Sequence, residues 1–221
     1  MHLPDGILPV SVLAAGYAAT GAVTWYSMRR IGREEDPREG IPKASLLTAA
    51  FFVASLIHIP VPPTSVHLIL NGLLGVVLGW YAFPAVLVGL FFQAVMFQHG
   101  GLTTLGVNAA VIGGPALLAY GIFRLRRLRP ASRTLTGVLG FLGGAAGVGI
   151  TVLLLFALLI TTIPAELDAA AERTAIYALV LAHVPLMLIE GVFTAMVVLF
   201  LLRVRPELLG EKRRPPEVAV R

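Results

Sequence analysis

The sequence predicts an all-α, polytopic membrane protein, and three observations lead to that fold class: an apolar composition, seven apolar stretches, and one-sided placement of the basic residues. Of 221 residues, 57% are hydrophobic and only 13% are charged, and the mean hydropathy is +0.86. Soluble domains usually carry about 25% charged residues. The chain has no cysteine, which excludes disulfides and thiolate metal sites.

Seven apolar stretches predict about seven transmembrane helices, because a helix that crosses the bilayer needs about 20 apolar residues. The third and fourth stretches are shorter, so we expect tilted helices or a hairpin that does not fully cross. The resulting membrane domain covers residues 1–204, with a leader at residues 1–7, and a cytoplasmic basic tail covers residues 205–221. The stretches are residues 8–28, 44–60, 66–81, 83–97, 104–123, 135–163 and 175–202.

The basic residues predict the orientation of the chain. Of the 17 lysines and arginines, all but Arg173 follow the first, fifth or seventh stretch. Alternating crossings put these three groups on one face. By the positive-inside rule the N-terminus is then outside and the C-terminus cytoplasmic. The net charge of +5 therefore indicates topology and no nucleic-acid partner, and the predicted location is a plasma membrane of prokaryotic type.

The histidines lie on the opposite side from the basic groups. His2, His58, His67 and His99 fall at or beside outer ends of the stretches, and His183 lies about two turns into the last one. Imidazole is the commonest side-chain metal ligand. The asymmetry predicts a site that receives a metal ion from outside.

The first two residues can form a compact nitrogen chelate. The α-amine of Met1, the amide nitrogen of His2 and the His2 imidazole can close fused rings around one ion, with a fourth position left for another imidazole. A planar nitrogen set favours Ni(II), Cu(II) or low-spin Co(II) over tetrahedral Zn(II). The alternative is a loose leader in which His2 has no role. No signal-peptide pattern is present, so we expect the leader to remain on the protein.

Four ordered blocks resemble the CbiM/NikM family, the substrate-capture membrane subunits of cobalt and nickel energy-coupling factor (ECF) transporters. The first block, MHLPDGIL, is similar to the family's MHIPDG start. The others are PTSVH, which ends in a histidine, the run QAVMFQHGGLTTLGVN, and HVPL followed by IEG. They occupy residues 1–8, 63–67, 93–108 and 183–191.

The resemblance implies a metal ion held by the Met1 amine, the His2 amide and imidazole nitrogens, and the His67 imidazole. It also implies a transported Ni(II) or Co(II) ion, no resident cofactor and no enzymatic activity. Expected partners are a transmembrane coupling subunit, two cytoplasmic ABC ATPases and a small accessory membrane subunit. The chain itself has no Gly-x-x-x-x-Gly-Lys-Ser/Thr loop for ATP, so ATP hydrolysis is expected in the partners.

Five polar residues are expected to surround the ligands. Asn71 follows His67 by four residues, so on a helix it would share a face with His67 and orient its ring. We expect Asp5 and Ser65 to hydrogen-bond around the leader, and His99 and Asn108 to line the same pocket. For Ser65, capping of the third helix is an equally good interpretation. For His99, a wetted polar residue at a helix end is an equally good interpretation.

Glu190 and a glycine series in the sixth stretch are interpreted as structural. Glu190 lies near mid-membrane, where ionisable residues are costly and usually functional. We interpret it as a hydrogen-bonding or conformational group between helices rather than a metal ligand, with ion passage as the alternative role. Small residues four apart allow close helix packing, and internal packing is favoured over partner docking. The series is Gly140, Gly143, Gly144 and Gly147.

Two other functions remain open from the residues alone. A non-transporting membrane metal sensor would use the same ligands. An intramembrane metalloenzyme would use His183 and Glu190, but the His-Glu-x-x-His pattern of such enzymes is absent. Nickel and cobalt both accept a planar nitrogen set, so both stay candidates for the ion.

Overall fold

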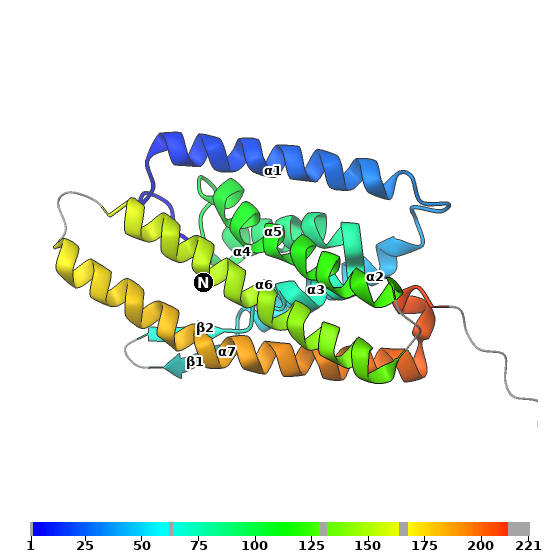
Figure 1. The fold of residues 1–221 in the computed structure, drawn as a ribbon. Coiled ribbons are helices and arrows are strands. Elements are labelled where there is room, and N and C mark those ends of the chain that lie inside the picture. Colours follow the sequence, from blue (N-terminus) through cyan, green and yellow to red (C-terminus); the bar gives the residue numbers. More distant parts are fainter. Residues whose placement is uncertain (1, 62–63, 129–131, 164–167, 212–221) are drawn as a thin grey trace, which may run out of the picture.

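The computed structural model describes residues 2–61, 64–128, 132–163 and 168–211, which form a helical bundle with one β-hairpin (Figure 1). The α-helices are α1 (Val10–Ile31), α2 (Gly40–Ala54), α3 (Asn71–Leu78), α4 (Ala82–Phe97), α5 (Leu105–Arg124), α6 (Arg133–Thr161) and α7 (Ala169–Val204). The hairpin strands are β1 (His58–Val61) and β2 (Thr64–His67). Short 3-10 turns are η1 (Gly79–Tyr81), η2 (Leu125–Leu128) and η3 (Pro206–Leu209).

Each predicted apolar stretch contains one α-helix, but the lengths and compositions of the described helices do not confirm seven crossings. Four helical runs qualify, and α2 is a shorter apolar helix. The helix α3 has only eight residues, about 12 Å of rise against a hydrocarbon core of about 30 Å. The described residues thus support four or five crossing helices. The runs are Asn71–Phe97, Leu105–Leu128, Arg133–Thr161 and Ala169–Val204.

The predicted all-α fold class is confirmed for the described residues, with one short exception where the second stretch ends and the third begins. Strands β1 and β2 pair antiparallel there, with His58 opposite His67 and Ile59 opposite Val66. The sequence from Pro60 to Pro63 contains three prolines. Proline lacks a backbone N–H and disfavours helical geometry in the residue before it, so α2 does not continue into the apolar residues of β1.

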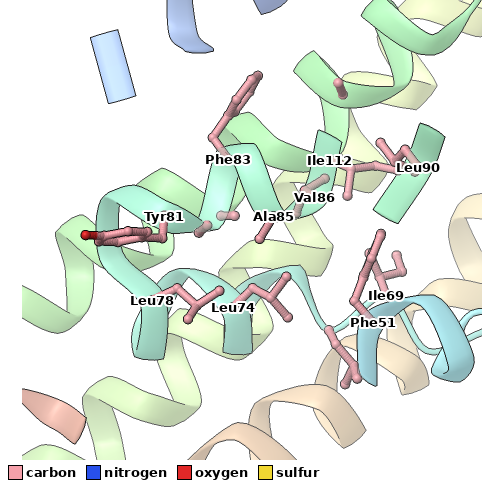
Figure 2. Close-up of a cluster of buried hydrophobic side chains, with 14 of the residues drawn as sticks. Phe51, Ile69, Leu74, Leu78, Tyr81, Phe83, Ala85, Val86, Leu90 and Ile112 are labelled. Carbon is pink, nitrogen blue, oxygen red and sulfur yellow. The ribbon is translucent and has the colours of Figure 1, made fainter. Parts of the chain in front are cut away.

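The third and fourth stretches form a helical hairpin that carries the main hydrophobic core. Figure 2 shows the chain passing Leu74 and Leu78, turning at Tyr81 and returning along α4 to Leu90. Gly79 adopts φ 62° in this turn, a conformation that glycine reaches without steric cost. The hairpin is one of the two alternatives expected for these short stretches.

The glycines of α6 pack inside the molecule. Helix α3 lies so close to α5 and α6 that a Cβ on Gly72 would be 2.6 Å from the Gly143 carbonyl oxygen, and one on Gly75 would be 1.9 Å from that of Ala116. Such contacts would force the helices apart. The prediction of internal packing is confirmed, and α3 packs directly against α5 and α6.

The basic segments after α1, α5 and α7 meet at one end of the bundle, away from the leader (Figure 1). Lys43 Nζ donates to the carbonyl of Leu208 at 3.2 Å, and Arg126 pairs with Glu211. Leu209 is buried. The first residues of the expected tail therefore pack on the membrane domain, while residues 212–221 lie outside the described residues.

Candidate metal centre

The leader folds back from the start of α1 and docks on the loop before α5 (Figure 1). The side-chain amide of Asn108 makes a reciprocal pair with the backbone of Leu3: the Leu3 N–H donates to Oδ1 at 2.9 Å, and Nδ2 donates to the Leu3 carbonyl at 3.0 Å. Thr104 Oγ1 donates to the same carbonyl at 2.7 Å. Leu3 and Leu8 are buried against Val107. The leader is thus a fixed element rather than a loose one.

Asp5 anchors the other side of the leader. Its carboxylate accepts hydrogen bonds from the hydroxyl of Thr103 at 2.6 Å and from the amides of Thr103 and Thr104. These bonds, the Thr103 hydroxyl foremost, lower the pKa of the Asp5 carboxyl, so the group is anionic at neutral pH. A Cβ on Gly101 would lie 1.8 Å from Asp5 Oδ1, so only glycine permits this approach.

Three histidines meet where the docked leader ends. His2, His67 and His99 each offer a ring nitrogen, and these nitrogens all lie within 4.8 Å of one another. The rings of His2 and His67 are stacked, with centroids 5.2 Å apart and planes 9° apart. His99 stands edge-on to both, 4.4 Å from His2 and 5.2 Å from His67 between centroids. Residues nearly 100 positions apart therefore share one site.

His67 is held in a form that suits a metal ligand. Its side chain is 3% exposed, and Nδ1 lies 3.1 Å from the Leu68 carbonyl oxygen. A carbonyl can only accept, so Nδ1 carries the hydrogen in this bond and Nε2 presents a lone pair. Burial lowers the pKa of the His67 imidazole below its usual value, so the neutral ring is favoured at physiological pH.

His99 reaches the cluster through a tight turn at the end of α4. Gln98 adopts the left-handed conformation, φ 52°, and Gly100 has φ 86°. The amides of Gln98 and His99 both donate to the carbonyl of Gln93. The structure places His99 beside the two predicted ligands, closer than the wetted helix-end interpretation implies. Two glycines directly after His99 are the sequence signal for this turn.

Glu190 holds the backbone that follows His67. Its carboxylate, 1% exposed, accepts hydrogen bonds from the N–H groups of Ile69 and Leu70, the latter at 2.8 Å. Leu70 adopts φ 54° immediately before α3, a conformation that costs roughly 1–2 kcal/mol for a non-glycine residue. The interpretation of Glu190 as a hydrogen-bonding group agrees with this geometry, although its partners are backbone amides after a strand.

The expected contact between Asn71 and His67 was wrong. The spacing of four residues assumed one helix, but His67 ends β2 and Asn71 begins α3. Asn71 Nδ2 donates instead to the carbonyls of Ile112 and Gly147 and to Thr151 Oγ1, at 2.9, 3.1 and 2.9 Å. Asn71 therefore fastens α3 between α5 and α6.

The remaining predicted residues have separate outcomes. Ser65 lies in β2 opposite Pro60. Met1, the source of the α-amine, lies outside the described residues. His183 is buried in α7, with Nδ1 2.7 Å from the Leu179 carbonyl oxygen. Sequence reasoning missed Thr103 and Thr104 as anchors of the leader.

Replacing Asn108 is expected to loosen the leader and weaken metal binding. Asn108→Ala removes both halves of the amide pair with Leu3, so His2 loses its fixed approach to His67. Losses of such supporting contacts usually cost about 10–100-fold in metal affinity. Calorimetric nickel titration measures the change, and hydrogen exchange should show faster exchange at the Leu3 amide.

The control for Asn108→Ala is Thr161→Ala, because the hydrogen bonds of Thr161 to described residues stay within its own helix, at Ala157 and Leu158. That variant should bind metal as tightly as the wild-type protein. Equal affinity in the two variants would show that leader docking does not contribute to the site.

Comparisons with known proteins agree on metal transport. A family profile described as the cobalt uptake substrate-specific transmembrane region matches residues 2–208. The chain is 35% identical to a metal transport protein of Haemophilus influenzae, over 95% of this chain and 97% of the relative. It is 32% identical to the fused nickel transport protein NikMN of Rhodobacter capsulatus, over 97% of this chain and 65% of that protein.

A solved structure is also similar. The crystal structure of a truncated transition metal transporter superposes with a TM-score of 0.72 at 27% identity, over 92% of this chain and 99% of that one.

Proposed function

The chain belongs to the CbiM family of cobalt-uptake transmembrane proteins, and on that premise we propose that it is the metal-capturing subunit of a nickel or cobalt importer. The Met1 amine, the His2 amide and imidazole nitrogens, and the His67 imidazole hold the ion in a planar set. His99 offers a further nitrogen beside that set. The ion is the transported cargo and no resident cofactor is required.

One observation carries the proposal: a hydrogen-bonded leader brings His2 within 4.8 Å of His67 and His99. A chain end is normally the most mobile part of a protein. Here two side chains, Asn108 and Asp5, hold it by at least four hydrogen bonds. Ordering the leader before the ion arrives lowers the entropic cost of binding.

The transport cycle follows from the two ends of the bundle. The histidine site faces outward and the basic end faces the cytoplasm, according to the positive-inside rule. Capture occurs outside, and release inside requires the buried site to change its access. Without a phosphate-binding loop of its own, the chain takes energy from two cytoplasmic ATPases through a transmembrane coupling subunit, with a small accessory membrane subunit in the same complex.

Competitive metal binding tests the proposal. Purified full-length protein with a native Met1 amine should bind one Ni(II) or Co(II) ion and hold it against a tenfold excess of Zn(II), because a planar set suits the d-electron preferences of those ions. An absorption band typical of planar nitrogen coordination should accompany nickel binding. A preference for Zn(II), or no binding, would contradict the planar site.

Measuring metal uptake by cells distinguishes a transporter from a metal sensor. Cells that express the chain with its coupling and ATPase subunits should accumulate radioactive nickel or cobalt, and cells lacking the ATPases should not. Binding without ATPase-dependent accumulation would favour the metal sensor instead.

A further inference from the structure

A polar cavity of about 310 Å³ lies at the basic end of the bundle, away from the histidine site. The C-terminal end of α1 forms one side, and the end of α5 with η2 forms the other. Four arginines line it, together with Glu34 and the aromatic rings of Trp80 and Tyr120. The arginines are Arg30, Arg33, Arg124 and Arg127.

Two of these arginines are held in place by aromatic rings. The guanidinium carbon of Arg30 lies 5.0 Å from the centre of the Trp80 ring, and that of Arg124 lies 5.5 Å from the centre of the Tyr120 ring. The two rings contact each other edge to face at 5.4 Å. A guanidinium over an aromatic face is attracted by the ring, and it keeps N–H donors that can bind an anion. The cavity is therefore preorganised.

The positive charge around the cavity is not neutralised by the described part of the chain. No ion pair between described residues involves any of the four arginines, whereas neighbouring Arg126 is paired with Glu211. The only carboxylate in the lining is Glu34, which accepts a hydrogen bond from Tyr81 Oη at 3.2 Å. Four guanidiniums against one carboxylate create a positive potential that attracts an anion.

We propose that this cavity binds the phosphate headgroup of an anionic phospholipid. Arginine pairs bidentately with phosphate oxygens, and basic pockets between transmembrane helices are known to take anionic headgroups. Trp80 and Tyr120 are the residue types found at headgroup depth. Met28 and Leu125, on the same helix ends, are about half exposed and provide apolar surface for the acyl chains.

The positive-inside rule alone does not account for this arrangement. That rule needs only a count of basic residues in the connecting segments. It requires neither convergence of arginines from segments almost 100 residues apart nor the placement of Arg30 and Arg124 over two rings that contact each other. A phosphate site explains both features, and it does not depend on the metal-capture function.

Lipid titration of the purified full-length protein tests the site. The probes are dioleoyl phosphatidylglycerol, dioleoyl phosphatidylcholine, and inorganic phosphate as a soluble anion. The variant Arg33→Gln/Arg127→Gln removes two exposed guanidiniums from the lining. Its control, Arg38→Gln/Arg203→Gln, removes two exposed charges outside the cavity.

The wild-type protein is expected to bind phosphatidylglycerol in preference to the other two probes. The Arg33→Gln/Arg127→Gln variant, called the cavity pair below, should bind phosphatidylglycerol roughly 25-fold more weakly, about fivefold for each guanidinium lost near the membrane surface. The control pair, Arg38→Gln/Arg203→Gln, should change the affinity for phosphatidylglycerol less than twofold. Without lipid, both variants should have the melting temperature of the wild type. These results would support the proposal.

Three results would overturn it. Equal losses in the cavity and control pairs would indicate only general surface charge. Inorganic phosphate binding as tightly as phosphatidylglycerol would identify a soluble anion as the ligand. No lipid preference, together with loss of co-purification with a coupling subunit in the cavity pair alone, would assign the site to an acidic protein partner.

Discussion

A three-residue extension ahead of Met1 is expected to lower nickel or cobalt affinity more than about 100-fold, beyond the effect of losing a supporting contact. The α-amine can close a chelate ring with the His2 amide only when Met1 is the first residue. An extension converts that amine into a peptide nitrogen and also places chain where the leader ends beside His67. Isothermal titration on purified protein, with the start of the chain verified by mass spectrometry, measures the loss.

The length of the extension matters. A single added residue would put His2 third from the new amine, and that spacing can itself wrap a planar nitrogen set around Ni(II). Three residues avoid this artefact.

The matched control inserts the same three residues after Glu211, beyond the last described residue, and should bind as the wild type does. His67→Ala, which removes one nitrogen but keeps the amine, should also weaken binding. Unchanged affinity in the extended protein would refute the role of the amine.

Glu190→Ala is expected to destabilise the protein by roughly 2–6 kcal/mol and to weaken metal binding at the same time. The substitution leaves the N–H groups of Ile69 and Leu70 buried without their acceptors, and each such group costs roughly 1–3 kcal/mol. It also releases the left-handed turn at Leu70 that follows His67. Denaturant titration in detergent gives the stability, and calorimetry gives the affinity.

Two further variants define the role of Glu190. Glu190→Gln keeps one oxygen that can accept and should fall between Glu190→Ala and the wild type in both measurements. Ile189→Ala, on the neighbouring position of α7 with 53% of the side chain exposed, should change neither by much. If Glu190→Ala lowered stability but left affinity unchanged, the carboxylate would support the fold without positioning His67.

The apolar pattern predicted where helices occur but not how the chain passes from one to the next. Every predicted stretch contains a helix, because burial of apolar side chains in lipid is a local property of each segment. The hairpin of β1 and β2 was not predicted, since its first strand continues the apolar run of the second stretch and its second strand has only four residues. The three prolines from Pro60 to Pro63 are the sequence signal against a helix at this point.

The site was predicted in its residue types and only partly in its arrangement. His2 and His67 were predicted as ligands from the sequence. His99 was assigned to the same pocket, with a solvated residue at a helix end as the alternative. The turn at Gln98 that directs His99 inward depends on a left-handed conformation of a non-glycine residue. Such conformations persist only where surrounding contacts hold them, so the two glycines after His99 indicate a turn but not the left-handed conformation of Gln98 that directs it.

For the first eight residues, too, one property follows from the sequence and another only from the tertiary structure. The sequence by itself determined their chemistry, an amine beside a histidine in a membrane protein, because functional groups are fixed by residue identity. Only the tertiary structure decided that the leader is docked, through the Asn108 amide and the Asp5 carboxylate. Those contacts join residues about 100 positions apart, and hydrogen bonds between distant segments exist only after the helices have packed.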